Sequence, residues 1–442
     1  MDKYVIEGGR KLYGTIALQS AKNSVLPLLA ASILTEKRVV IRETPEITDV
    51  KCMAQILREL GADVRFSGGN AIIESADACC HEISSVLTGE LRSSVFMLGS
   101  LLTRFHRALI AYPGGCDIGL RPIDLHLNAL KQLGVSISER DGCIFCACEK
   151  LRGAEILLDF PSVGATENIL LAAVKAEGRT VLAGAAKEPE IVDLQNFLNA
   201  MGAKIAGAGT DVIEIEGVKE LGGVTYRPMK DRIEAGTFLI ACAACGGEVE
   251  TSGLKGENLR LLLHKLRENG CKIHTKNDKI NIESRGRLRC NRRIETMPFP
   301  GFPTDLQAQA TALNAGAEGG ALIVENLFET RFKYVPELQK MGADIEVKGR
   351  HAFVRGVERL STSVKLIINH AGNCLTNQHA DINRTHDILV DERLCEFIVA
   401  CDVQMTDSVR YADIVLPDVA RAEQANLVSS GNADIVRALV RG

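Results

Sequence analysis

The stretch 57-LRELGADV-64 recurs four more times along the chain, and this repetition decides the fold. The later copies are 130-LKQLGVSI-137, 198-LNAMGAKI-205, 266-LRENGCKI-273 and 338-LQKMGADI-345. Each copy has the pattern of a helix that ends at a glycine and is followed by a strand. The spacing of about 70 residues means that each unit holds several strands and at least one helix. The sequence therefore predicts an α/β protein built from repeated units.

Apolar runs between the copies, such as 38-RVVIRE-43 and 211-DVIEIEG-217, predict strands. The chain has 442 residues, 46% hydrophobic and 24% charged, which is typical of a globular protein with two or three domains. The net charge is −4 and the basic run 285-RGRLRCNRR-293 contains no aromatic residue, so we expect no nucleic-acid binding. No apolar run approaches the roughly 20 residues of a membrane helix, and the N-terminus lacks a signal peptide. We therefore expect a cytoplasmic protein without a membrane partner.

The 14 cysteines are too few for a disulfide framework in a chain of this length, and we expect free thiols. Cys143, Cys146 and Cys148, and likewise Cys242 and Cys245, have spacings that could hold zinc. Their apolar neighbours predict a buried strand at 143–148 and a buried helix at 238–245 instead. We favour cysteines as small core residues at both places.

The repeat stops before the end of the chain. A sixth copy should fall near residue 412, where the sequence reads 410-RYADIVLPD-418 and has no matching glycine. From about residue 366 the composition changes as well, because His370, His379 and His386 lie close together among asparagines. Drift of a terminal repeat would explain the lost glycine but not the changed composition. We predict that a different segment begins there.

The stretch 111-AYPGGCDIGLRP-122 contains a candidate reactive thiol, Cys116. Gly114 and Gly115 permit an unusual backbone ahead of it. A nearby cation such as Arg121 would favour the thiolate, which is the nucleophilic form. The alternative is that Cys116 is one of many unreactive cysteines.

The stretch 20-SAKNSVLPLLAASIL-34 predicts a helix that Ser20 caps, with Lys22 in its first turn. A cation is unfavourable at this end of a helix unless an anion such as a phosphate neutralises it. An exposed Lys22 that points into solvent is the structural alternative.

A second helix start lies in 161-PSVGATENILLAA-173, where a glycine-containing turn could hold a phosphate or a uracil edge. Simple capping by Ser162 or Thr166 explains the same pattern equally well.

In 303-PTDLQAQATAL-313, Thr304 and Gln307 match a capping box, which places Asp305 in the first helical turn. Structure alone would explain this aspartate. A role as general base needs separate support, because the pKa of a free aspartate is only about 3.9.

Arg92 lies in the helical pattern 91-LRSSVFML-98 and could be an ordinary surface arginine. Glu329 and Arg331 could simply pair with each other. Taken together, the candidates are two anion-binding helix starts, two arginines, a thiol and a carboxylate. This set suits a transferase of phosphorylated substrates, and the sequence contains no nucleotide-binding glycine motif.

Seven stretches resemble the UDP-N-acetylglucosamine 1-carboxyvinyltransferase family of enolpyruvyl transferases, over residues 1–365. They are 21-AKNSVLPLLAA-31, 113-PGGCDIGLRPIDLH-126, 162-SVGATENI-169, 187-KEPEIVD-193, 231-DRIEAGTF-238, 303-PTDLQAQ-309 and 325-ENLFETRF-332. The resemblance implies a two-domain inverted α/β barrel-like fold built from repeated βαβαββ units. The first domain would be residues 22–229, with the cysteine loop at 112–122. The second would be residues 1–21 with 230–365 and would be incomplete.

The resemblance also implies a reaction in peptidoglycan synthesis, and hence in cell-wall biogenesis, cell shape and cell division. The enolpyruvyl group of phosphoenolpyruvate would pass to the 3′-hydroxyl of UDP-N-acetylglucosamine with release of phosphate, without a cofactor or metal. Cys116 would donate a proton and react with fosfomycin, Lys22 would bind phosphoenolpyruvate with Arg121, and Asp305 would orient the 3′-hydroxyl. The family's UDP-sugar site corresponds to Asn23, Arg92, Arg121, Pro122, Ile123, Asp124, Leu125, Ser162, Val163, Gly164, Asp305 and Leu327.

After 356-GVERLSTS-363 the chain departs from this family. It lacks the Thr-Asp-Leu-Arg segment and a later arginine, and with them two cationic contacts to phosphoenolpyruvate. An active enzyme and an impaired chimera that retains only UDP-sugar binding therefore both remain open.

Residues 366–442 resemble a fragment of a molybdopterin oxidoreductase of the dimethyl-sulfoxide-reductase family. The resemblance lies in 371-AGNCLTNQHADINRT-385 and 396-EFIVACDVQMTDSVRYADIVLPD-418, where we expect strands at 397–401 and 413–418. A fragment this short lacks the rest of the cofactor site, so we expect no bound molybdenum. An oxidoreductase activity is the least favoured hypothesis.

Overall fold

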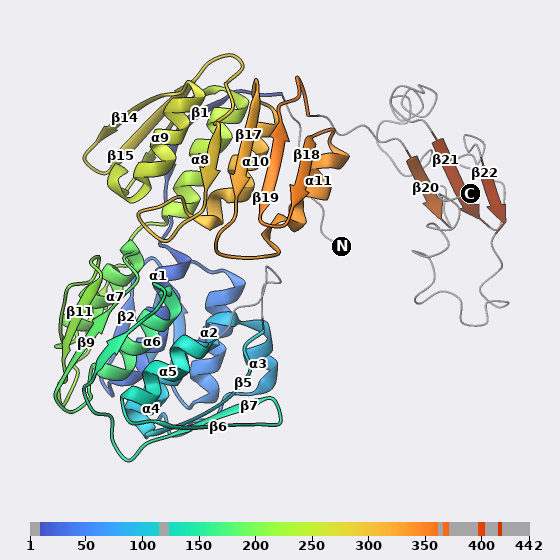
Figure 1. Ribbon diagram of the computed structural model, residues 1–442. Helices are drawn as coiled ribbons and strands as arrows, with labels where there is room; N and C mark the ends of the chain where they lie inside the picture. Colours follow the sequence, from blue (N-terminus) through green and yellow to red (C-terminus); the bar gives the residue numbers. More distant parts are fainter. Residues whose placement is uncertain (1–8, 115–122, 361–365, 371–396, 403–413, 418–442) are drawn as a thin grey trace. The chain divides into compact units, whose positions relative to one another are not determined.

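The computed structural model describes residues 9–114, 123–360, 366–370, 397–402 and 414–417 (Figure 1). The chain divides into two compact units. The first comprises Met1–Gln339 and Ala343–Leu360, and the second comprises Lys340–Gly342 and Ser361–Gly442.

The described part of the first unit contains five sheets, and four of them share one arrangement of strands. In the copy formed by β8 (Glu155–Leu157), β9 (Arg179–Ala183), β10 (Lys204–Ala206) and β11 (Val212–Glu216), β8 pairs in parallel with β9. Strand β9 pairs antiparallel with β11, which forms a hairpin with β10. Three of the other four sheets share this order, and in the remaining one, which contains Arg107–Ala111, the parallel edge strand is reduced to an isolated bridge between Glu82 and Leu109. The predicted α/β class with its repeated βαβαββ unit is confirmed.

The remaining sheets of this unit are β12 (Val224–Tyr226)–β2 (Val39–Ile41)–β4 (Asn70–Glu74)–β3 (Asp63–Ser67), β5 (Arg107–Ala111)–β7 (Cys143–Ala147)–β6 (Ser136–Arg140), β1 (Leu12–Ala17)–β13 (Gly247–Ser252)–β15 (Lys279–Ser284)–β14 (Lys272–Lys276), and β16 (Arg293–Glu295)–β17 (Gly320–Val324)–β19 (His351–Arg355)–β18 (Asp344–Lys348). The α-helices are α1 (Lys22–Ala31), α2 (Thr48–Glu59), α3 (Ser85–Glu90), α4 (Met97–Phe105), α5 (Asp124–Gln132), α6 (Val163–Ala173), α7 (Pro189–Ala200), α8 (Arg232–Cys245), α9 (Arg260–Asn269), α10 (Gln307–Ala315) and α11 (Val335–Lys340). Short 3₁₀ turns are η1 (Ser32–Leu34), η2 (Arg92–Phe96), η3 (Gly256–Leu259), η4 (Thr304–Leu306) and η5 (Arg331–Tyr334).

The glycine of every recurring phrase follows a helix and precedes a strand, as predicted. The φ angles of Gly61, Gly134, Gly202, Gly270 and Gly342 are +97°, +94°, +103°, +108° and +88°. Other L-residues rarely adopt positive φ, so glycine lets the chain leave the helix and turn into the hairpin. The phrase therefore marks the same turn in all five copies.

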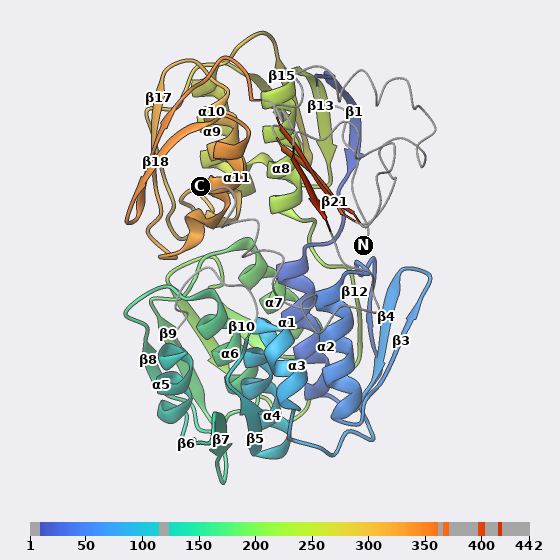
Figure 2. The same cartoon turned by 90° about the vertical axis from the view of Figure 1, so that its right-hand side faces the viewer.

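Helices lie inside the first unit and sheets lie outside. Residues Ser24–Ala31 of α1 and Ala165–Ala173 of α6 are all buried, whereas β11 alternates exposed and buried side chains. Figure 2 shows α1, α2 and α6 between β3 and β4 on one side and β8 and β9 on the other. Helices that are hydrophobic on all sides are expected to be buried in this way.

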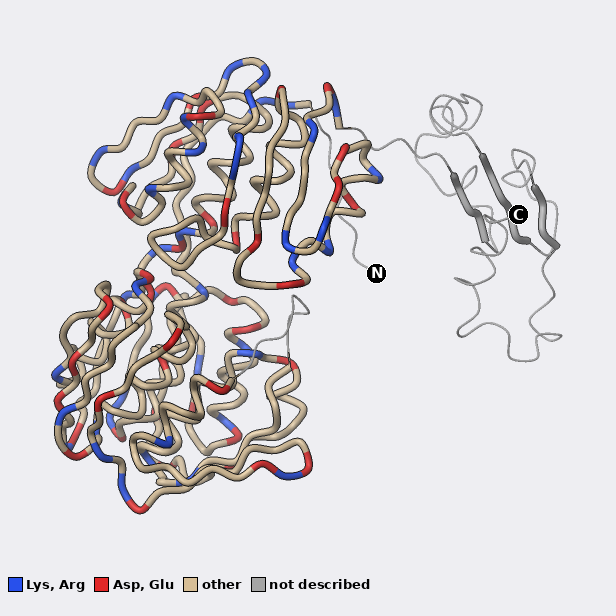
Figure 3. Tube along the Cα trace, viewed as in Figure 1, with Lys and Arg blue, Asp and Glu red and all other residues tan. Residues whose placement is uncertain are grey.

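The buried apolar side chains form two separate hydrophobic cores. The first core extends from Val25 to Leu221, and the second contains Leu18 and residues from Ala235 to Val354. Basic and acidic residues are interspersed along the described trace around both cores (Figure 3). Among the described residues, no helix combines the length and the apolar composition that crossing a bilayer requires.

The chain connects the two cores twice, and the two connections pair with each other. The Ala21 amide donates to the Met229 carbonyl at 2.9 Å, and the Asp231 amide donates to the Gln19 carbonyl at 2.9 Å. Two chain segments that are about 200 residues apart in sequence are thereby held together by backbone hydrogen bonds.

One carboxylate at this crossing caps two helices. Asp231 Oδ1 accepts from the amides of Ile233 and Glu234 at 2.7 and 3.0 Å, at the start of α8. Asp231 Oδ2 accepts from the Lys22 amide at 3.3 Å, at the start of α1. The prediction that Ser20 caps α1 is wrong, because the helix begins at Lys22 and receives its acceptor from the distant Asp231.

Replacing Asp231 by alanine should lower the free energy of unfolding by about 2 kcal/mol, the upper end for loss of a helix cap, because two helix starts lose their acceptor together. Ser162→Ala is the matched control, since Ser162 caps α6 through one bond from the Ala165 amide at 3.3 Å. We expect Ser162→Ala to lower the free energy of unfolding by about 1 kcal/mol, because only a single cap is lost. Urea unfolding measures both variants, and equal losses would contradict the double cap.

The second unit contains β20 (Leu366–His370), β21 (Phe397–Asp402) and β22 (Ile414–Pro417). Both strand pairs in the described residues of this unit are parallel, unlike the mixed sheets of the repeats. The strands predicted at 397–401 and 413–418 are confirmed.

Candidate active site

The predicted site residues that the structure describes fall into two groups, one from the part of the chain that forms each hydrophobic core. Cys116, Arg121 and Pro122 lie outside the described residues. The first-core group consists of Lys22, Asn23, Arg92, Ile123, Asp124, Leu125, Ser162, Val163 and Gly164. The second-core group consists of Asp305 and Leu327.

Two hydrogen bonds hold the backbone at Pro113 and Gly114, directly ahead of the cysteine loop. Arg92 Nη1 donates to the Pro113 carbonyl at 3.0 Å, and the Gly114 amide donates to the Thr88 carbonyl at 2.9 Å. A Cβ atom at Gly114 would overlap the Gly89 carbonyl, so the close approach requires glycine. Arg92 therefore holds the backbone directly ahead of the cysteine loop.

Lys22 is the first residue of α1 and is half-exposed. Its Nζ pairs with Asp49 Oδ2 at 3.0 Å, in the first turn of α2. The alternative of a lysine pointing freely into solvent is therefore wrong. Nothing in the sequence points to Asp49, because it lies 27 residues from Lys22 and on a different helix.

The starts of α5 and α6 meet in the first core. Ser162 caps α6, which is one of the two alternatives that the sequence left open. A Cβ atom at Gly164 would lie 3.0 Å from Cε1 of His126, a residue in the first turn of α5. The predicted UDP-sugar segments 123–125 and 162–164 therefore belong to neighbouring helix starts.

Asp305 forms an ion pair in the second core. Its Oδ1 accepts from Arg331 Nη2 at 2.7 Å, and the Arg331 side chain is only 17% exposed, whereas that of Asp305 is 42% exposed. The suggested pairing of Arg331 with Glu329 is wrong, because Glu329 pairs with Arg350 at 2.6 Å. The arrangement leaves a carboxylate that is oriented by a guanidinium and still accessible.

The predicted capping box at Thr304 and Gln307 does not form. The Thr304 hydroxyl donates to Glu325 Oε2 at 2.8 Å, and Gln307 Oε1 accepts from the Tyr334 hydroxyl at 2.8 Å. The chain forms the 3₁₀ turn η4 at residues 304–306 before α10 begins. Thr304 donates to Glu325 because a buried carboxylate without hydrogen-bond donors costs more free energy than a helix start without a side-chain cap.

Glu325 positions both members of the second-core group. Its Oε2 accepts from Thr304, the residue next to Asp305. Its Oε1 accepts from the Leu327 amide at 2.9 Å and from the Thr296 hydroxyl at 2.9 Å. Glu325 is fully buried. It stands in the quoted motif 325-ENLFETRF-332, but nothing in its local pattern indicated this role.

Three buried glutamates and one arginine form what we call the acidic cluster: Glu167, Glu188, Glu190 and Arg232. Arg232 Nε donates to Glu190 Oε1 at 2.8 Å, and the Phe299 amide donates to Glu188 Oε1 at 3.2 Å. Burial raises the pKa of Glu167 well above its usual range, and the charges of Glu190 and then Glu188 raise it further. Arg232 thus pairs with Glu190 and lies near Glu188, whereas the nearby charges that act on Glu167 are the two other carboxylates.

The raised pKa of Glu167 predicts a pH-dependent stability difference. The folded protein holds this proton more tightly than the unfolded chain, so the stabilisation is complete at low pH and is lost as pH rises through the folded pKa. Glu167→Gln keeps the shape but cannot ionise. We expect the variant to gain stability over the unmodified protein between pH 5 and pH 8 in urea unfolding. A constant difference across that range would contradict a protonated Glu167.

The predicted strand and helix form as β7 and α8, but only Cys146 and Cys242 are buried core residues. Cys143 and Cys148 are partly buried and Cys245 is exposed, so the prediction of core cysteines is wrong for these three. Burial raises the pKa of Cys146 to about 12 and that of Cys242 to about 11. Such thiols are poor nucleophiles and poor metal ligands at neutral pH.

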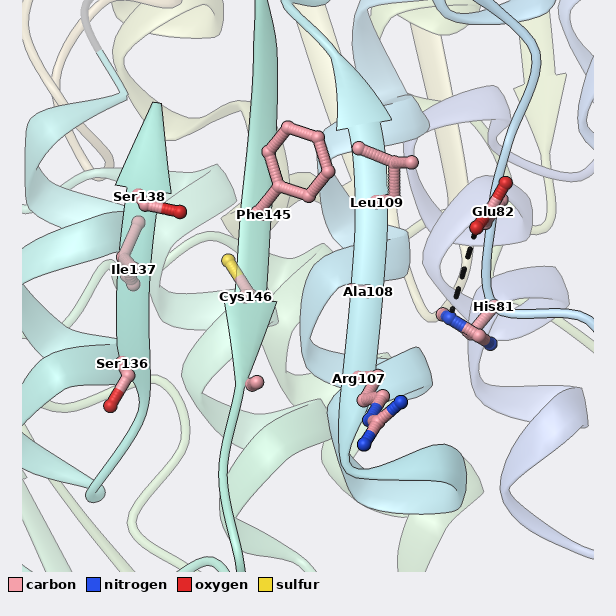
Figure 4. A pocket seen from close by; sticks show the side chains of 11 residues that line it. His81, Glu82, Arg107, Ala108, Leu109, Ser136, Ile137, Ser138, Phe145 and Cys146 are labelled. Carbon is pink, nitrogen blue, oxygen red and sulfur yellow. Dashed lines mark ion pairs between the residues drawn. The ribbon is translucent and has the colours of Figure 1, made fainter. Parts of the chain in front are cut away.

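A surface pocket lies on the sheet formed by β5, β7 and β6 (Figure 4). Leu109, Phe145 and Ile137 contribute one side chain from each strand, and His81 and Glu82 lie beside them. No described member of the predicted site lines this pocket, so it is separate from the groups above.

Comparison with known proteins gives one family and several relatives. The sequence profile of the EPSP synthase (3-phosphoshikimate 1-carboxyvinyltransferase) family matches residues 6–388. This match continues past residue 365, the predicted end of the resemblance. UDP-N-acetylglucosamine 1-carboxyvinyltransferase 2 of Caldanaerobacter subterraneus is 50% identical over 361 residues, which are 82% of this chain and 87% of that protein. UDP-N-acetylglucosamine 1-carboxyvinyltransferase 1 of Symbiobacterium thermophilum is 48% identical over 366 residues, covering 81% and 83%.

Solved structures share the fold. The enolpyruvyl transferase NikO from Streptomyces tendae is 22% identical with a TM-score of 0.72, over 83% of this chain and 86% of that one. EPSP synthase from Acinetobacter baumannii is 17% identical with a TM-score of 0.61, over 91% and 94%. These likenesses confirm the predicted enolpyruvyl transferase fold.

Proposed function

Because this chain belongs to the family of UDP-N-acetylglucosamine 1-carboxyvinyltransferases, we propose that it transfers the enolpyruvyl group of phosphoenolpyruvate to the 3′-hydroxyl of UDP-N-acetylglucosamine and releases phosphate. The observation that carries this function is the 50% identity over 361 residues with a relative of that name. The product is a precursor of peptidoglycan.

We assign the proton transfers to Cys116 and Asp305. Cys116 gives a proton to the methylene carbon of phosphoenolpyruvate while the sugar 3′-oxygen bonds to the adjacent carbon. Asp305 orients the 3′-hydroxyl and takes its proton, and the contact with Arg331 at 2.7 Å supports this role by fixing the carboxylate. The tetrahedral adduct then returns a methyl proton to the Cys116 thiolate as its bond to phosphate breaks, which leaves the enol ether and free phosphate.

We assign anion binding to the first-core group together with Arg121. Lys22 and Arg121 bind the phosphate and carboxylate of phosphoenolpyruvate, and the start of α6 at Ser162 faces the UDP-sugar. The positive end of the α6 dipole favours a diphosphate there. Asp49 holds the Lys22 ammonium at 3.0 Å and keeps it near the start of α1.

We further propose that residues 22–229, with the cysteine loop at 112–122, form one domain and that residues 1–21 with 230–365 form the other. The two separate hydrophobic cores support this division. For residues 366–442 we propose descent from a molybdopterin oxidoreductase, which the parallel sheet of β20, β21 and β22 supports. Elemental analysis of the purified protein should find no molybdenum, and a stoichiometric amount would contradict the view that this segment is only a fragment.

Phosphate release in the presence of both substrates tests the proposed function. We expect release to require phosphoenolpyruvate and UDP-N-acetylglucosamine together. The alternative is an impaired chimera, because the family's Thr-Asp-Leu-Arg segment is missing from the sequence after residue 363. In that case calorimetry would detect UDP-sugar binding while no phosphate is released.

A further inference from the structure

The fully buried side chain of Asn168, in α6, connects three elements of the first core. Its Oδ1 accepts from the Gly99 amide at 2.6 Å, and its Nδ2 donates to the Val95 carbonyl at 2.9 Å. The same Nδ2 lies 3.1 Å from Nδ1 of His126 in α5. Asn168 therefore links α6 both to the segment that begins with Arg92 and to α5.

These contacts fix the position of the proton on His126. A backbone amide can only donate and a backbone carbonyl can only accept, so Gly99 and Val95 determine which end of the Asn168 amide is nitrogen. The amide nitrogen can only donate, so Nδ1 of His126 must accept. A neutral imidazole then carries its proton on Nε2.

The ring is neutral at physiological pH. Burial, and then the positive charge of Arg92, lower the pKa of His126 to about 4. The His126 side chain is only 6% exposed.

The protonated edge of the ring faces the first turn of α6. A Cβ atom at Gly164 would lie 3.0 Å from Cε1 and 3.2 Å from Nε2 of His126. Glycine at this position thus allows α6 to pack directly on the ring. The ring lies between the two helix starts to which the UDP-sugar is assigned.

We propose that Asn168 and His126 are positioning residues for the UDP-sugar: Asn168 holds the imidazole as the Nε2-protonated tautomer, and the imidazole sets the first turn of α6 against α5. This inference rests on the proposed function for the identity of the ligand. Neither residue takes part in the proton transfers. Loss of the pair should weaken UDP-sugar binding and leave the phosphoenolpyruvate site intact.

Nitrogen NMR of the protein labelled with ¹⁵N-histidine tests the tautomer without any assay of activity. We expect the His126 ring, assigned by its loss in His126→Gln, to have a bare Nδ1 and a protonated Nε2 at pH 7. Asn168→Asp keeps the acceptor for Gly99 but cannot donate, so the ring proton should move to Nδ1. A protonated Nδ1 in the unmodified protein would overturn the proposal.

Steady-state kinetics test the positioning role. Asn168→Ala should raise KM for UDP-N-acetylglucosamine about tenfold, which corresponds to one lost hydrogen bond of about 1.4 kcal/mol. The turnover number and KM for phosphoenolpyruvate should change less than about twofold. His264→Ala, at an exposed histidine of α9, is the control and should change neither constant.

An equal rise in both KM values, or lower stability with unchanged kinetics, would overturn the positioning role. An inactive unmodified protein would instead refute the proposed function. The NMR result separates these failures, because it depends only on the folded chain.

Discussion

Replacing Asp305 by alanine should lower the rate of phosphate release by about 10²–10⁴-fold, the usual contribution of a general base. The carboxylate is accessible, Arg331 orients it at 2.7 Å, and Thr304 beside it is bonded to the buried Glu325. Such a preorganised group accepts a proton without first having to be ordered. Steady-state turnover with both substrates saturating measures the effect.

A matched control and a second variant separate the roles of Asp305. Asp344 is similarly exposed and pairs with Arg355 at 3.2 Å, so Asp344→Ala should change turnover less than about twofold, as for an ordinary surface ion pair. The side-chain amide in Asp305→Asn still accepts a hydrogen bond from Arg331, but an amide is a very weak base. If Asp305→Asn keeps full turnover, Asp305 only orients the hydroxyl and the proton goes elsewhere.

Replacing Cys116 by alanine should abolish covalent labelling by fosfomycin. The two glycines ahead of the thiol and Arg121 after it favour a reactive thiolate. The loop starts from a backbone held by Arg92 at the Pro113 carbonyl, which fixes where the segment begins. The mass of the intact protein reports the adduct, which we expect at one equivalent before the substitution and at none after it.

Two exposed thiols provide the control for this labelling. Cys79→Ala and Cys245→Ala remove accessible cysteines outside the loop, and we expect both variants to be labelled as fully as the unmodified protein. Labelling of Cys116→Ala at another cysteine would remove the basis for assigning the reactive thiol. Folding of each variant is verified by its urea unfolding midpoint.

The repeat was predictable because its signal is local. Gly61 and its four counterparts follow a helix within the same short phrase, and the φ angle of each is positive. A turn of this kind depends on its own residues, so the sequence contains all the information that it needs. The strands at 38–43 and 211–217 were likewise visible as short apolar runs.

The capping predictions failed where the partner was distant. The start of α1 takes its acceptor from Asp231, which is 209 residues away, and Thr304 turns to Glu325 instead of capping α10. A capping pattern states what a residue can do locally, but it cannot show which competing partner the fold brings close.

The candidate site was predictable in its residues but not in its contacts. The pairs Lys22–Asp49 and Asp305–Arg331 each join different elements, and no single stretch contains both members. The Asn168–His126 contact could not be predicted from the sequence either, since an asparagine inside a helix usually lies on the surface and has little effect on stability. These contacts become apparent only once the helix starts are placed together.

The order of the strands has a consequence for synthesis on the ribosome. Strand β1 emerges first, yet its parallel partner β13 ends only at Ser252. At the usual rate of elongation the nascent β1 therefore waits on the order of 10–50 s for its neighbour. Throughout this time an unpaired strand edge is open to chaperones or to other chains, and translation speed becomes a determinant of yield.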